Sequence, residues 1–160
     1  EIRLSLVGSE MCIRDRVMKK VKAYERSPFY YETDRMNVIH HSNYIRWFEE
    51  ARIYFMEQVG YSYAKMESEG IMMPVLSAAC EYKNSVKFGD TVIIKTAINE
   101  FNGFKMSIQY IITDKNTGEL RAKGNTSHCF TDMSMKPVRI KKTFPELFDI
   151  YSSYAGEKLF

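Results

Sequence analysis

The chain has few cysteines, no paired metal-binding motif and no long apolar run. Its three cysteines, Cys12, Cys80 and Cys129, are far apart and odd in number, which fits neither a disulfide framework nor a C-x-x-C metal site. No stretch reaches the roughly 18 consecutive apolar residues of a membrane helix, and the N-terminus lacks the basic start and apolar run of a secretory signal. These absences predict a cytoplasmic protein without membrane contact.

Charge of one sign is also lacking. The 23 basic and 20 acidic residues are mixed along the 160-residue chain and leave a net charge of only +3. Such a balance gives no field that would favour nucleic acid as a partner. The length and the 45% hydrophobic content are enough for one domain with a continuous core and too small for two ordinary ones.

The first sixteen residues share no pattern with the rest of the chain, whereas Met18-Lys19-Lys20 has the form of a translation start. The stretch 1–16 also resembles the translation of a sequencing-adapter run. We therefore expect residues 1–16 to be a non-native or disordered extension. Residues 17–155 are expected to form the single domain.

A long central helix is predicted over the stretch 42–60. Its main apolar stripe recurs at steps of four, three, four and four residues and consists of Tyr44, Phe48, Ala51, Phe55 and Val59. Four further apolar residues widen that surface, which indicates cover on more than one side: Trp47, Ile53, Tyr54 and Met56. Ser42 or Asn43 can cap the start, and Gly60 ends the helix. Arg46 and Glu50 have the four-residue spacing of an exposed ion pair.

Strand-like segments surround this helix. Residues 21–31 are rich in β-formers but contain Pro28, which predicts a bent or edge strand. After a short helix over 62–69, the expected strands are 71–84, 91–100, 104–112 and 120–131, followed by a closing helix over 144–151. Asn102-Gly103 is a hairpin signal, and the apolar face of the strand after it is expected to consist of Phe104, Met106, Ile108, Tyr110 and Ile112. The small residues Ala122, Gly124 and Thr126 on one face would let a helix or a second subunit approach closely.

The simplest packing of these pieces is an α+β hotdog fold, in which a curved antiparallel sheet wraps around the central helix. Asp34 then lies shortly before the start of that helix. A carboxylate there could attack a carbonyl or activate a water, and unpaired N–H groups at the helix start could hold an oxyanion. Spacing alone equally allows Asp34 to cap a turn and His41 to be an ordinary loop residue.

The stretch 31–44 resembles the signature of the 4-hydroxybenzoyl-CoA thioesterase family, in particular its bacterial acyl-CoA thioesterase branch. The residues that carry this resemblance are Tyr-Glu-Thr-Asp ending at Asp34, then His41 and Asn43-Tyr44. The resemblance extends loosely over 24–151. It implies that Asp34 is the catalytic carboxylate and that the His41 backbone N–H contacts the thioester carbonyl. Asn37 stands where the family usually has Gly, and Asn tolerates positive φ with more steric cost.

The resemblance therefore implies an acyl-CoA thioesterase that needs no cofactor and forms a homodimer or homotetramer. Its substrate is an acyl-CoA, with acyl carrier protein as another possible carrier. Expected substrate contacts near Asp34 are Asn37, Val38, His40 and Tyr44. The basic run 136–142, with Lys136 and Arg139, is a candidate for the CoA phosphates, although a solvated charged face is the commoner role of such a run.

The sequence gives less support to three other functions. A metal site is disfavoured, because His40, His41 and His128 share no standard ligand spacing with a carboxylate or cysteine. A hotdog hydratase would place His five residues after the aspartate, where this chain has Ile39. A non-catalytic acyl-CoA sensor would use the same fold, but the chain has no room for a DNA-binding domain.

Overall fold

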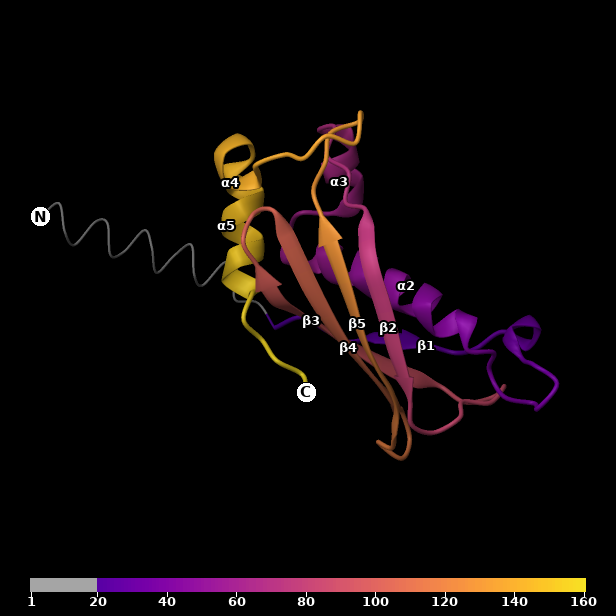
Figure 1. The fold of residues 1–160 in the computed structure, drawn as a ribbon. Coiled ribbons are helices and arrows are strands. Elements are labelled where there is room, and N and C mark those ends of the chain that lie inside the picture. The colour runs from indigo at the N-terminus through magenta and orange to yellow at the C-terminus, as the bar shows by residue number, and fades with distance from the viewer. Residues whose placement is uncertain (1–19) are drawn as a thin grey trace, which may run out of the picture.

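The computed structural model describes residues 20–160, and Figure 1 shows their arrangement. The expected extension over 1–16 lies outside the described residues. Within residues 20–160 the architecture is α+β, with one antiparallel sheet and a long helix against it. None of the helices in this part of the chain has the length and apolar character needed to cross a membrane.

The five-stranded sheet has the order β1-β3-β4-β5-β2, with every neighbouring pair antiparallel. The strands, in that order, are β1 (Tyr24–Arg26), β3 (Val92–Phe101), β4 (Lys105–Asp114), β5 (Leu120–Cys129) and β2 (Val75–Tyr82). The edge position predicted for the Pro28 segment is confirmed, because β1 lies at one edge of the sheet. The strand expected over 71–84 begins only at Val75 and occupies the other edge.

The hairpin between β3 and β4 turns at Asn102-Gly103, as the sequence predicts, with Gly103 at φ 86°. The Asn102 side chain accepts the N–H groups of Phe104 and Lys105 at 2.9 and 2.8 Å. Phe104 was expected on the apolar face of the strand, but it belongs to this turn and is exposed. The alternation that follows is confirmed, since these four inward residues are buried: Met106, Ile108, Tyr110 and Ile112.

Helix α2 (Ser42–Val59) lies against one face of the sheet (Figure 1). All five residues of its predicted stripe are buried, and so are Trp47 and Met56. Gly60 ends the helix at φ 94° in the left-handed region, as expected. Glu50 pairs with Arg26 on β1, with 3.1 Å between Nε and Oε2, instead of with Arg46. The tertiary contact with a buried guanidinium therefore replaces the predicted ion pair along the helix.

The small-residue face of β5 receives the helix. A Cβ built on Gly124 would lie 2.2 Å from ring atoms of Phe48 on α2. That ring stacks on Tyr110 with 4.5 Å between the centroids. The sequence allowed either a helix or a second subunit to approach this face closely, and in the structure it is the helix that does so.

The remaining elements are helices of 3 to 10 residues. They are η1 (Tyr30–Glu32), α3 (Tyr63–Ser68), α4 (Ile140–Thr143) and α5 (Pro145–Tyr154). The Tyr151 hydroxyl of α5 donates to the carbonyl of Tyr61 at 2.8 Å, which ties the C-terminal helix to the end of α2. A curved antiparallel sheet holding one long buried helix is the hotdog arrangement predicted from the sequence.

Candidate active site

The loop between η1 and α2 is a small antiparallel ladder. Thr33 and Ile39 form an isolated bridge, and Asp34 donates its N–H to the carbonyl of Val38 at 2.8 Å. Asn37 turns the chain at φ 60° and donates its N–H to the carbonyl of Asp34 at 3.1 Å. Asn37 thus adopts the positive φ for which a glycine would be the easier residue. The loop is a defined turn that fixes the backbone of Asp34.

The Asp34 side chain is held by this same turn. Its Oδ1 accepts the backbone N–H of Met36 at 2.7 Å. The second oxygen, Oδ2, has no hydrogen-bond donor among residues 20–160. The side chain is half-buried. A carboxylate fixed through one oxygen and open at the other can accept a proton from water or attack an electrophilic carbon.

His41 is the N-terminal cap of the 18-residue helix α2. Its backbone N–H meets no acceptor in the described part of the chain, as is common for the first N–H groups of a helix. The cap expected from Ser42 or Asn43 is wrong: Asn43 is inside the helix and donates through Nδ2 to the carbonyls of Glu32 and His40 at 3.0 and 3.2 Å. The open N–H and the positive end of the helix dipole favour a developing negative charge.

Asp34 and His41 line one shallow cleft of about 260 Å³. The full lining is Asp34, Met36, Val38, Ile39, His41, Tyr44, Tyr82, Lys83, Asn84 and Ser85. Of the predicted substrate contacts, Val38 and Tyr44 belong to this cleft. Asn37 lies at the tip of the turn, and the His40 ring is held beside Ser42, with 2.8 Å between Nδ1 and Oγ. The cleft combines a carboxylate, an open N–H and apolar or aromatic walls.

The last residue of β2 and the three after it form one wall of the cleft, which was not predicted from the sequence. The Tyr82 hydroxyl donates to the carbonyl of His41 at 2.9 Å. Partial desolvation raises the pKa of Tyr82 to about 12, with a further contribution from Cys80 nearby, so the hydroxyl stays protonated at neutral pH. Aromatic residues at a strand end were the only signal of this wall in the sequence.

Lys136 and Arg139 lie away from the cleft in the same chain. The turn that carries them begins at Thr131, which forms bridges with both Pro137 and Met72. Met72 lies just before the start of β2, whereas the cleft lies at the other end of that strand, at Tyr82. The seven residue steps of β2 span roughly 23 Å at the usual strand rise. Arg139 instead borders a separate hollow together with Gly103, Phe104 and Lys141.

The rings of His40 and His41 lie together, with 4.1 Å between their centroids, whereas the third histidine is on another element. His128 is fully buried on β5, where Nε2 lies 2.8 Å from Thr126 Oγ1. Burial, together with the charge of Arg52, lowers the pKa of His128 to about 4, so the ring is neutral at physiological pH. Residues 20–160 contain no group of three or more His, Cys, Asp or Glu side chains placed to hold a metal ion.

Comparison with known proteins identifies the family that this chain resembles. Residues 30–148 match the model of the "Thioesterase-like superfamily". A Bacillus subtilis (strain 168) protein named "Putative acyl-CoA thioesterase YneP" is 36% identical over 123 residues, which cover 76% of this chain and 88% of that protein. The solved structure of a DHNA-CoA thioesterase from Staphylococcus aureus aligns with a TM-score of 0.78 and 35% identity, covering 82% of this chain and 88% of that one.

Proposed function

The chain belongs to the thioesterase-like superfamily and is a thioester hydrolase, and on that premise we propose that it hydrolyses an acyl-CoA thioester with Asp34 as its catalytic carboxylate. The observation that carries the proposal is the shared cleft, which is lined by both Asp34 and His41. The names of the two similar proteins support acyl-CoA as the substrate class, and acyl carrier protein remains a second carrier to test.

Two routes are open to Asp34. As a general base, Oδ2 takes a proton from a water whose oxygen bonds to the thioester carbon; the C–S bond then breaks, CoA leaves as a thiolate, and transfer of the proton from Oδ2 to that thiolate restores the carboxylate. As a nucleophile, Oδ2 bonds to that carbon, CoA leaves, and water cleaves the resulting anhydride to restore the carboxylate. Both routes place negative charge on the carbonyl oxygen.

The His41 N–H is the proposed donor to that oxygen. It is open at the start of α2, and a single donor of this kind typically contributes about a hundredfold or more to the rate. The charge at the helix N-terminus adds to it. A hydratase has less support, because Ile39 stands at the position that would carry its histidine, and Ile39 is a buried core residue without a titratable group.

We further propose that a second copy of the chain pairs along β2. This edge strand is exposed over nearly all of its length, including Val75, Leu76 and Tyr82. In a two-fold pair the strands run antiparallel. The start of β2 in one copy, with the turn carrying Lys136 and Arg139, would then lie beside the cleft of the other. This arrangement supports the predicted role of these two cations at the CoA phosphates.

The test is release of free thiol from a panel of short, long and aromatic acyl-CoA substrates and an acylated carrier protein. The Asp34→Asn variant should fold and lose about a hundredfold or more in kcat, while Asp149→Asn on the exposed face of α5 should keep wild-type activity. Saturable binding without thiol release by the wild-type chain would favour the sensor reading. Mass spectrometry of the quenched chain separates the two routes, because only nucleophilic attack adds the acyl mass to the protein.

A further inference from the structure

A buried carboxylate lies at the base of the active-site loop. Glu32, the last residue of η1, is only 4% exposed, and each of its carboxylate oxygens accepts two hydrogen bonds. Oε1 accepts from Arg26 Nη2 at 2.8 Å and from Trp47 Nε1 at 3.0 Å. Oε2 accepts from Arg26 Nη1 at 2.6 Å and from the Phe29 N–H at 2.7 Å. The donors come from β1, from α2 and from the chain just before η1.

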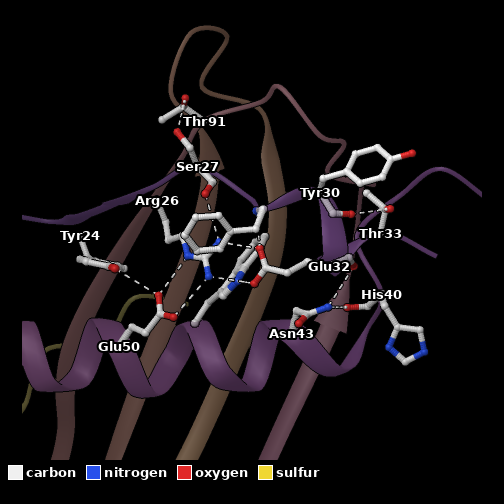
Figure 2. A network of polar contacts seen from close by, with 12 residues as sticks. Tyr24, Arg26, Ser27, Tyr30, Glu32, Thr33, His40, Asn43, Glu50 and Thr91 are labelled. Carbon is white, nitrogen blue, oxygen red and sulfur yellow. Dashed lines mark hydrogen bonds and ion pairs between the residues drawn. The ribbon is translucent and has the colours of Figure 1, made fainter.

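The backbone of the same residue holds the loop. The Glu32 carbonyl accepts the N–H of His40 at 2.8 Å and Nδ2 of Asn43 at 3.0 Å. Figure 2 shows this carbonyl facing His40 and Asn43 while the side chain turns toward Arg26. Asp34 follows Glu32 by two residues, and His41 directly follows His40. Both groups of the proposed mechanism are therefore within two residues of the Glu32–His40 hydrogen bond.

From this arrangement we infer that Glu32 is a positioning residue, which fixes the Asp34 carboxylate and the His41 N–H relative to each other. The inference rests on the proposed function. A displacement of the loop would break charge-assisted hydrogen bonds to a buried carboxylate, and removing one partner of such a buried pair is strongly unfavourable. Through Glu32 the loop is thereby attached to two elements, β1 by way of Arg26 and α2 by way of Trp47.

The charge state of Glu32 is consistent with this role. Burial by itself raises its pKa, but the hydrogen bonds from Arg26, Trp47 and the Phe29 N–H outweigh that effect and hold the pKa below its ordinary value. Glu32 is thus ionised over the neutral pH range, in which all four of its acceptor contacts remain intact.

Glu50 provides a matched control within the same cluster. It contacts the same guanidinium, with 3.1 Å between Arg26 Nε and Oε2, and it accepts the Tyr24 hydroxyl at 3.1 Å. It is 38% exposed and makes no hydrogen bond to the loop in the described structure. Its replacement perturbs Arg26 without touching the backbone of residues 33–41.

The experiment is a double-mutant cycle in which kcat and KM are measured for wild type, Glu32→Gln, Asp34→Asn and the double variant, with Glu50→Gln as control. Glu32→Gln should lower kcat roughly ten- to a hundredfold, the effect expected of a small displacement of reacting groups. KM should change little, and Glu50→Gln should stay within about threefold of wild type because its ion pair is partly exposed. In the Asp34→Asn background Glu32→Gln should have no further effect.

Two results would overturn the inference. One is a folded Glu32→Gln variant with wild-type kcat, and the other is an equal loss in both backgrounds, which would point to a general loss of folded protein. If Glu32→Gln does not fold, Arg26→Lys tests the same Arg26–Glu32 ion pair, because Lys keeps the charge but cannot make the bidentate hydrogen bonds. Arg26→Lys should also lower kcat.

Hydrogen exchange separates this inference from the proposed function. Glu32→Gln should speed amide exchange at Asp34 and His40, whose N–H groups are bonded within the ladder, while Glu50→Gln should leave it unchanged. An inactive wild type, or an Asp34→Asn variant as active as wild type, would reject the proposed function. Unchanged exchange in Glu32→Gln would reject the holding role of Glu32, whatever the activity.

Discussion

At the residue scale, Tyr82 connects the edge strand to the proposed oxyanion donor. Its hydroxyl donates to the His41 carbonyl, and its ring packs edge-on against Tyr44 with 5.0 Å between the centroids. The peptide that carries the His41 carbonyl also carries the N–H of Ser42, at the first turn of α2. Tyr82 therefore restrains the orientation of the chain at the point where the helix begins.

We expect Tyr82→Phe to lower kcat by roughly tenfold and to change KM by less than about threefold, because the ring remains while one backbone anchor is lost. Steady-state thiol release measures both constants. Tyr31→Phe is the matched control, since that hydroxyl is exposed and makes no hydrogen bond among the described residues. Wild-type kcat in Tyr82→Phe would mean that the hydrogen bond has no part in orienting His41.

At the element scale, the contact between α2 and β5 depends on the absence of a side chain at Gly124. The Phe48 ring fills the space where a Cβ would stand, and it is stacked on Tyr110 from the neighbouring strand. Protein interiors are close-packed, so an added methyl group must displace either the ring or the helix. This contact fixes how closely the helix approaches the sheet.

Gly124→Ala should therefore lower the free energy of unfolding by about 1–3 kcal/mol, the usual range for an overpacked core. Urea denaturation measures the change. In a Phe48→Leu background the same substitution should be less unfavourable, because the smaller side chain leaves room for the methyl group. Equal losses in the two backgrounds would contradict the steric origin of the effect.

The helices and strands could largely be predicted from the sequence, because their periods are local. The apolar stripe of α2, the hairpin at Asn102-Gly103 and the buried face of β4 are all confirmed. Pairings between distant segments were beyond such reasoning. Arg46 is the neighbour of Glu50 on the helix, yet Glu50 pairs with Arg26, 24 residues earlier in the chain.

The site was also predictable only where its residues are close together in the sequence. The motif placed Asp34 and His41 correctly before and at the start of α2, and the structure brings both to one cleft. The opposite wall comes from the end of β2, where Tyr82 is 41 residues from His41. Local spacing also could not reveal that Lys136 and Arg139 lie near the other end of that strand.

At the scale of the whole molecule, the unpaired edge of β2 has a consequence for activity. If two copies pair there, each cleft gains the basic turn of the other copy, and Ala79 lies near the middle of the shared edge. In such a pair a lysine at this position would lie close to the equivalent lysine across the two-fold axis. Like charges placed opposite each other across an interface oppose association.

If the proposed dimer forms through β2, Ala79→Lys should convert it to a monomer in sedimentation experiments and lower thiol release most strongly in dilute protein. Asp149→Lys on α5, far from β2 in Figure 1, should leave both properties unchanged. A variant that still dimerises would place the interface elsewhere. A fully active monomer would show that the cleft needs nothing from a second copy.

The same edge matters before any pairing has taken place. Residues 75–80 are Val-Leu-Ser-Ala-Ala-Cys, a segment without charge, proline or glycine. Uncharged exposed strands of this length are templates for cross-β stacking and amyloid. A newly made chain would therefore be most prone to aggregate as a monomer. Pairing with a second copy along β2 would protect that strand from such aggregation.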